Sequence, residues 1–194
     1  MNRYLPMIDN WIYFGHLDQY AILPSYPEQI SDSMTSTFQS ESALSRSAPV
    51  FTYSNSGPRS VNVEFDLHRD MMDAVNINIS NMNVMPIGDD YVDTLIRYLQ
   101  ACAVPKYSLY SSGAKAVEPP WVAIKFGETV FIKGIINGNV SVTWKKPILA
   151  DNKYAMANVQ FTVYETDPYD AVSVAQKGSF RGLTRTMQKG IKKG

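Results

Sequence analysis

Apolar and polar residues alternate over much of the chain between residues 121 and 168. Successive side chains of a strand point to opposite faces of its sheet, so each alternating run predicts a strand with one buried face and one polar face. Three runs carry the pattern, on Val122, Ile124 and Phe126, then Val140, Val142 and Trp144, then Val159, Phe161 and Val163. Trp144 shares a strand face with Val140 and Val142, so we expect it in the core. Between the runs we expect a tight turn at residues 127–128 and a loop at residues 147–152.

The first third of the chain contains shorter runs. Residues 11–14 and 20–23 are apolar and predict two short strands, whereas residues 28–49 are rich in Ser, Thr and Gln. Ile30, Met34 and Phe38 fall on even positions of an extended ribbon, and Met34 and Phe38 also fit one helical face. Because Ser and Thr are poor helix formers, we expect a long strand that leads into a flexible excursion at residues 40–48.

Residues 50–68 predict a hairpin. Two apolar runs, 50–53 and 61–67, flank the turn-forming sequence Ser-Asn-Ser-Gly-Pro at 54–58. The second run alternates strictly, with Val61, Val63, Phe65 and Leu67 on one face. Residues 70–88 show no clear period and predict a long loop, or a weak ribbon at 75–79.

One segment has the period of a helix. After Asp89 or Asp90, either of which can cap its start, apolar residues recur every three or four positions and Pro105 ends the pattern. These residues are Val92, Leu95, Ile96, Leu99 and Ala103. We expect a helix over residues 89–103 that rests on the sheet, followed by an exposed loop at 107–116. The order of elements predicts an antiparallel α+β or mainly β domain.

Composition adds a charge asymmetry. The 194 residues have a formal net charge of zero, with 45% hydrophobic and 19% charged residues, as in ordered globular proteins. Residues 177–194 hold six basic residues and no acidic one; subtracting those six from 18 leaves 12 basic against 18 acidic residues before them. We therefore expect a domain at 1–176 and a basic arm at 177–194 that contacts an acidic partner, such as a second copy, unless it is simply a solvated terminus.

Residues suited to catalysis or metal binding are few. Cys102 is the only cysteine, which is expected to be a small buried residue, and the two histidines, His16 and His68, lie far apart. By parity His68 is expected on a solvated strand edge. No nucleophile, phosphate-loop or dinucleotide motif is present. Two acidic pairs could act as catalytic carboxylates. The pair at 89–90 is better explained as a helix cap, and the pair at 165 and 167 as the end of a strand before Pro168. We expect no enzyme activity, cofactor or metal.

Other partner classes are considered on the same residues. No run approaches the ~20 apolar residues of a membrane span, and the N-terminus is a poor signal peptide, so we expect a chain made in the cytoplasm. An acidic body would repel nucleic acid, despite the pair Lys145 and Lys146. Trp11, Trp121, Trp144 and twelve tyrosines could stack on sugars or bases, but packing in the core and at subunit interfaces explains them better.

Two segments together resemble a known family. They are residues 46–70, RSAPVFTYSNSGPRSVNVEFDLHRD, and residues 119–168, which contain a strand with a central Gly134, the strand V-S-V-T-W-K at 140–145, a proline-containing loop and the ending E-T-D-P at 165–168. Over roughly residues 11–170 the chain resembles the tube-type domain of contractile injection systems. That domain is found in the tube-initiator and adaptor proteins of myophage baseplates.

The resemblance implies a β-barrel or sandwich with one flanking helix, six copies of which form a ring stacked on the tail tube or the baseplate hub. The partners would be the chain itself, the tube protein and hub or wedge proteins of a virion. Relatives often carry a C-terminal LysM module; the residues after Pro168 are too few for one, which favours a joining role. The alternative is a carbohydrate-binding β-sandwich; a cell-wall hydrolase lacks its catalytic residues.

In the joining role the sites are interfaces. We expect the ribbon at 28–48 to pair between subunits and the basic arm to clasp an acidic neighbour. The candidate interface residues are Met34, Phe38, Lys145, Lys146, Pro147, Asp151, Arg181, Arg185 and Lys189.

Overall fold

The computed structural model describes residues 10–23, 26–42, 47–73, 83–86, 90–109, 115–118, 120–127 and 129–166, with residues 171 and 174. The expected basic arm, with Arg181, Arg185 and Lys189, lies outside these residues, as does the weak ribbon at 75–79. The division of the chain at residue 176 therefore stays a prediction.

The described residues form a mainly β structure with two helices, which confirms the predicted class. The strands are β1 (Asn10–Phe14), β2 (Gln19–Ile22), β3 (Gln29–Ser33), β4 (Ser36–Glu41), β5 (Val50–Ser56), β6 (Ser60–His68), β7 (Lys106–Leu109), β8 (Lys115–Glu118), β9 (Val122–Phe126), β10 (Val130–Ile136), β11 (Ser141–Ile148) and β12 (Tyr154–Glu165). The helices are α1 (Arg69–Asp73) and α2 (Tyr91–Ala101).

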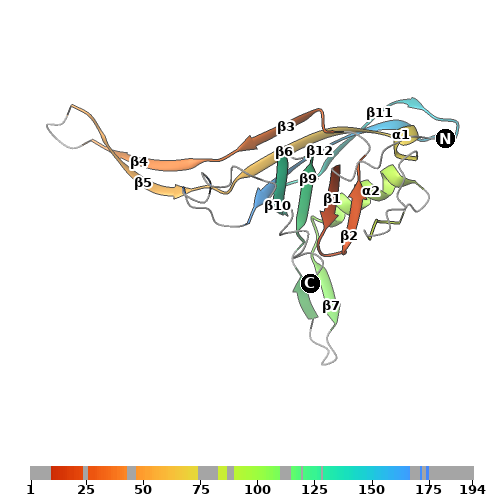
Figure 1. The fold of residues 1–194 in the computed structure, drawn as a ribbon, viewed down its shortest axis with the longest axis horizontal. Coiled ribbons are helices and arrows are strands. Elements are labelled where there is room, and N and C mark those ends of the chain that lie inside the picture. Colours follow the sequence, from red (N-terminus) through yellow and green to blue (C-terminus); the bar gives the residue numbers. More distant parts are fainter. Residues whose placement is uncertain are drawn as a thin grey trace.

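Eight strands build one antiparallel sheet. Seven of them follow the order β2-β1-β9-β10-β12-β6-β3. The eighth, β11, pairs with the first part of β12, whereas β10 pairs with its last residues. Two further strand pairs, β4–β5 and β7–β8, project from this body in different directions (Figure 1). Gly134 lies where β10 meets β12; a Cβ there would come within 1.8 Å of the Tyr164 carbonyl oxygen, so only glycine permits this approach of the two backbones.

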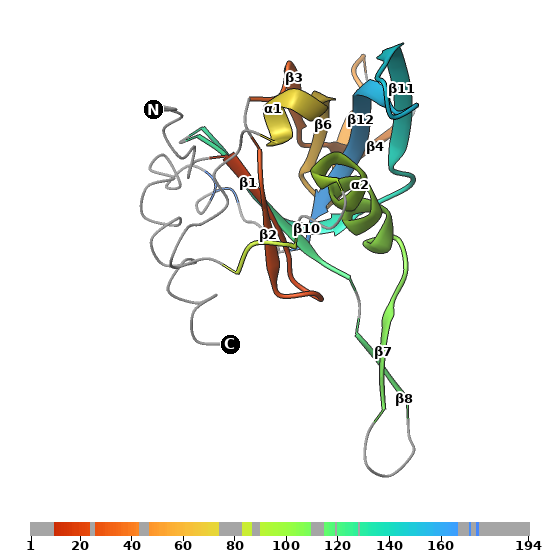
Figure 2. The same cartoon turned by 90° about the vertical axis from the view of Figure 1, so that its right-hand side faces the viewer.

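The main core lies between the sheet and α2, which crosses one sheet face in Figure 2. The alternating residues of β6 and β12 are buried on this face, as predicted, and α2 contributes Val92, Leu95, Ile96 and Leu99. Asp90 caps the helix by accepting hydrogen bonds from the backbone N–H groups of Val92 and Asp93, at 2.9 and 3.2 Å. A fully buried apolar side chain contributes about 1.5–3 kcal/mol, so this layer supplies most of the stabilisation.

The strand β9 differs from the prediction, because all of its residues are buried and it has no polar face. The predicted short apolar strand at residues 11–14 is confirmed as β1 and is likewise buried throughout. A second cluster, Trp11, Tyr13, Ala123 and Phe131, packs on the sheet face opposite the main core, with Trp121 at its margin. Even Lys125 in β9 is buried. Buried and exposed residues therefore alternate along a strand only where one face of the sheet meets solvent.

The hairpin predicted at 50–68 is wrong. β5 and β6 do not pair with each other; they run on in nearly the same direction (Figure 1), and β4 pairs with β5 while β3 pairs with β6. The two pairings follow one another along the same two segments, from Gln29↔Glu64 to Glu41↔Val50, with register shifts between residues 33 and 36 and between Thr37 and Phe38. Residues 29–41 and 50–64 therefore make one long ribbon, whose inner half is an edge of the main sheet and whose outer half, β4–β5, has two strands. At its midpoint the Gly57 N–H donates to the Thr35 carbonyl at 2.8 Å. The turn-forming residues 54–58 thus bend one strand rather than reverse the chain.

Four smaller expectations also fail. The segment expected as a loop at 107–116 contains the strands β7 and β8, and the start of the expected loop at 70–88 forms α1. Pro147 belongs to β11, where a bulge between Lys145 and Ile148 accommodates a residue that cannot donate a ladder hydrogen bond. Trp144 has the predicted parity, but it lies 40% exposed on the edge strand rather than in the core.

Candidate assembly surfaces

The outer half of the ribbon, β4–β5, forms an arm in which every described residue is exposed. Cross-strand partners share a face, so the pairs Phe38↔Tyr53 and Ser40↔Phe51 place three aromatic rings on one side. Phe38, Phe51 and Tyr53 are 55, 66 and 55% exposed, and the Phe38 and Tyr53 rings meet edge to face at 5.6 Å. We call these three residues the aromatic arm face. Met34, at the base of the arm, is also half-exposed.

Polar contacts anchor the arm to the body. The Arg59 guanidinium donates to both carboxylate oxygens of Asp32, with the shortest contact at 2.6 Å, and lies 3.4 Å from Glu165 of β12. The hydrogen bond to Asp32 raises the pKa of Arg59 further above its ordinary value. The hydroxyls of Ser33 and Ser60 meet at 2.7 Å beside this group. These contacts join β3 and the start of β6 to each other and to β12 at the base of the arm.

The end of the β11–β12 pair forms a second apolar surface. Ile148 pairs with Tyr154 across the strands, and the Tyr154 and Trp144 rings lie 6.3 Å apart. Trp144, Ile148 and Tyr154 are 40, 54 and 39% exposed, and we call them the β11 patch. Trp144 also lines a groove of about 250 Å³ between β11 and α2, with Asp93, Ile96, Arg97, Gln100 and Val142.

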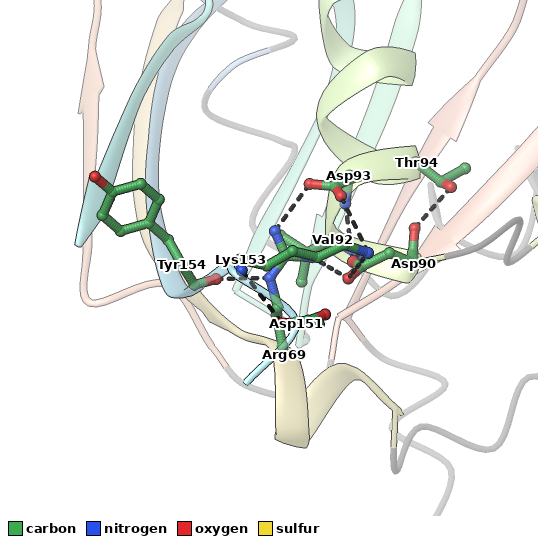
Figure 3. A network of polar contacts seen from close by, with 8 residues as sticks. All are labelled: Arg69, Asp90, Val92, Asp93, Thr94, Asp151, Lys153 and Tyr154. Atoms are coloured by element: carbon green, nitrogen blue, oxygen red, sulfur yellow. Dashed lines mark hydrogen bonds and ion pairs between the residues drawn. The ribbon is translucent and has the colours of Figure 1, made fainter. Parts of the chain in front are cut away.

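Behind the β11 patch lies a network of charged groups (Figure 3). Arg69 donates to Asp90, to Asp93 at 3.0 Å and to the Tyr154 carbonyl at 2.6 Å, and its guanidinium carbon lies 5.5 Å from the centre of the Trp144 ring. Lys153 lies 3.5 Å from Asp90. Burial alone would lower the pKa of Arg69, but the two carboxylates outweigh it and raise that pKa. The network ties the start of α2 to the strand that carries Tyr154.

The candidate interface residues fall at two separate places. Met34 and Phe38 lie on the ribbon, and Lys145, Lys146, Pro147 and Asp151 lie exposed at the end of β11 and in the turn that follows. Lys145 pairs with Asp66 at 3.0 Å, and the Asp151 carboxylate accepts the backbone N–H of Lys153 at 3.2 Å. Sequence reasoning missed Phe51, Tyr53, Ile148 and Tyr154, because their common faces follow from strand pairing and not from local alternation.

The titratable residues considered for chemistry have structural surroundings. Cys102 is buried, its thiol donates to the Tyr98 carbonyl at 3.3 Å, and burial raises its pKa to about 12. His68 is half-buried rather than solvated, and His16 is buried. Of the acidic pairs, Asp90 caps α2 and Glu165 holds Arg59, whereas Asp89 and Asp167 lie outside the described residues.

Neither metal-binding clusters, membrane-spanning helices nor similar known proteins indicate a further role for these surfaces. In the part of the chain that the structure describes, no three His, Cys, Asp or Glu side chains gather as a metal site would need, and no helix there has the length and apolarity to cross a membrane. Neither the family models nor the curated proteins compared with this chain gave a match.

Proposed function

We propose that this chain is a structural virion protein of a contractile phage tail, which forms a hexameric ring joining the tail tube to the baseplate hub. The kind of virion and the position within it rest on the sequence resemblance of residues 46–70 and 119–168 to tube-type domains. The antiparallel sheet with one helix on its face is compatible with that family. In this role the protein performs no chemistry and works through its contact surfaces.

The observation that carries the assembly role is the arm. A two-stranded ribbon without a third strand or a packed face is marginally stable in water, and here it also exposes three aromatic rings. Its strands lack the lysines, prolines and inward charges that protect isolated edges from pairing. Apolar patches of this kind mark surfaces that a partner covers. In a hexamer whose neighbouring subunits cover each arm, the strand edges of the arm would gain partners and its aromatic side chains would be buried.

The test is assembly on a template, because tube-like proteins can stay monomeric until they meet one. The purified chain is mixed with the tail tube protein of its own phage and the mixture is separated by sedimentation and viewed by negative-stain microscopy. We expect rings of this chain bound to one end of the tubes. A chain that stays monomeric and binds neither tube nor hub proteins would contradict the proposal.

A carbohydrate-binding role is the second candidate, favoured by one observation. The groove beside Trp144 combines a half-exposed indole with Asp93, Arg97 and Gln100, a set that can stack on and hydrogen-bond a sugar. Trp11, considered for this role from the sequence, is 2% exposed and cannot serve as a stacking surface. Saturable glycan binding that is lost in Trp144→Ala, with folding unchanged, would support this candidate; glycan binding that survives the substitution would remove the groove from consideration.

A further inference from the structure

We propose that Asn137 is a site of spontaneous deamidation, where the chain converts an asparagine into aspartate or isoaspartate without an enzyme. The dipeptide Asn-Gly occurs once in the 194 residues, at Asn137 and Gly138, in the link between β10 and β11. The inference concerns a covalent change of the chain itself, so it does not depend on the proposed function.

The reaction needs no reagent other than water. The Gly138 backbone nitrogen loses its proton to base and attacks the side-chain amide carbon of Asn137. A bond forms between this nitrogen and this carbon, the carbon–nitrogen bond of the side-chain amide breaks, and ammonia leaves with a proton taken from water. A water molecule then opens the succinimide at either carbonyl carbon, which yields aspartate or isoaspartate. Ammonia is released, water is consumed, and nothing is oxidised or reduced.

The attacking nitrogen is open to solvent. Asn137 and Gly138 are both exposed. The Asn137 N–H donates to the Thr162 carbonyl at 3.1 Å, and the pairing of β10 with β12 ends there. Within the described part of the chain the Gly138 N–H has no hydrogen-bond partner. Base can therefore remove its proton without breaking a contact of the fold.

The backbone also requires the glycine that makes the attack easy. Gly138 has a φ of +89°, which residues with a Cβ rarely adopt, and a Cβ built there would have no atom within 4 Å. The open space means that no neighbouring group shields the nitrogen. Because glycine has no side chain, it also hinders its own nitrogen least. The bend between β10 and β11 thus keeps a reactive dipeptide at its most exposed point.

Two other exposed asparagines lack one of these features. Asn139 is followed by Val140, whose β-branched side chain crowds the nitrogen that would attack. Asn152 is followed by Lys153, whose backbone N–H donates to the Asp151 carboxylate at 3.2 Å, so the proton that must leave is held in a hydrogen bond. We therefore expect both to convert more slowly than Asn137.

Mass spectrometry of the folded chain tests the site. The full chain is incubated at mildly alkaline pH, with circular dichroism to show that the fold is kept, and then digested briefly with trypsin. The peptide from Gly134 to Lys145 contains both Asn137 and Asn139, so fragmentation compares the two within one molecule. We expect the conversion of amide to acid at Asn137 to be at least about tenfold faster than at Asn139, a difference of about 1.4 kcal/mol in activation free energy.

The same event changes the charge of the chain. Its formal net charge is zero, and each conversion adds one negative charge, so a more acidic band should grow in native isoelectric focusing at the rate measured for Asn137. Asn137→Gln keeps an exposed amide but requires a larger ring for the attack, so this band should no longer form. The matched control Asn139→Gln should leave it unchanged.

A synthetic peptide of residues 134–145 measures the rate without the fold. We expect the folded chain to convert at a rate comparable to that of the peptide, because the fold leaves the Gly138 nitrogen open. An Asn137 that stays intact in the folded chain, or that converts no faster than Asn139, would overturn the inference. An acidic band that grows equally fast in Asn137→Gln would overturn it as well.

Discussion

The Tyr91 hydroxyl forms hydrogen bonds with backbone groups of the end strand β2, and removing it should destabilise the protein by a predictable amount. Tyr91 begins α2 and is 1% exposed. Its oxygen accepts the Ile22 N–H at 2.9 Å and donates to the Ile22 carbonyl at 3.0 Å. β2 is an end strand of the sheet, so this side chain satisfies backbone groups that no further strand reaches. Burial of the phenol raises its pKa to about 12, which keeps the donor protonated at all working pH values.

The substitution Tyr91→Phe deletes one atom and leaves the ring packed. It orphans a buried donor and a buried acceptor, each at a cost of about 1–3 kcal/mol, so we expect a loss of about 2–6 kcal/mol in the free energy of unfolding. For a chain of this size each kcal/mol lowers Tm by about 2–4 °C, which gives a fall of roughly 4–24 °C. Urea denaturation followed by tryptophan fluorescence measures the free energy, and calorimetry measures Tm.

Tyr53→Phe is the matched control, since it removes the same atom from an exposed tyrosine whose hydroxyl meets only the Ser56 hydroxyl at 2.6 Å. A change within about 0.5 kcal/mol is expected there. If Tyr91→Phe costs no more than Tyr53→Phe, the hydroxyl does not satisfy the edge of β2 and the packing of α2 against that strand is misassigned.

Three further predictions concern the sheet and the thiol. Gly134→Ala should cost about 3 kcal/mol or more in urea denaturation, since its methyl would strike the Tyr164 carbonyl; a loss as small as that of Ile135→Ala would contradict the close approach. Burial acts to raise the pKa of Asp66, but hydrogen bonds from Asn158 and Lys145 lower it overall. Its stabilisation is thus present above the unfolded pKa and lost as pH falls, so Asp66→Asn should flatten the loss of stability between about pH 5 and pH 2, and an unchanged pH curve would refute this. Cys102 should react with a thiol reagent at pH 8 only after unfolding, and rapid labelling of the native protein would contradict its burial.

The predictable part of this fold is the part in which local pattern and burial agree. The strict alternation of β6, the apolar face of β12 and the spacing of α2 were all recognisable in sequence, since each element buries one face against the same core. The cap was narrowed to Asp89 or Asp90 for the same local reason, and Asp90 is the residue that caps α2. These features depend on residues within a few positions of one another.

The pairing within the ribbon could not be predicted from local sequence patterns. Ser, Thr and Asn are common both in turns and in solvated strands, so residues 54–58 looked like a reversal when they are a bend. The pairing of Thr35 with Gly57 joins residues from two strands, and no local period reports it. Trp144 shows a related limit: parity gave the correct face, but its exposure depends on how far α2 covers the edge strand.

The candidate surfaces were only half accessible to sequence reasoning. Pro147 and Asp151 were chosen in an expected loop, and Lys145 and Lys146 directly before it. They border the β11 patch, but none of its three residues was among the candidate interface residues. On the arm, Phe38 was named without Phe51 and Tyr53, which join it only through the register of β4 and β5. An interface that is completed by a second copy leaves no partner within the chain from which it could be inferred.

The most direct test of the assembly role is a cryo-EM reconstruction of the phage particle from which the chain comes, at a resolution that traces side chains. We predict a sixfold ring of this chain at the junction of tube and baseplate, in which neighbouring copies cover the β4–β5 arm of each subunit. A particle that lacks the chain, or a junction built without it, would contradict the account.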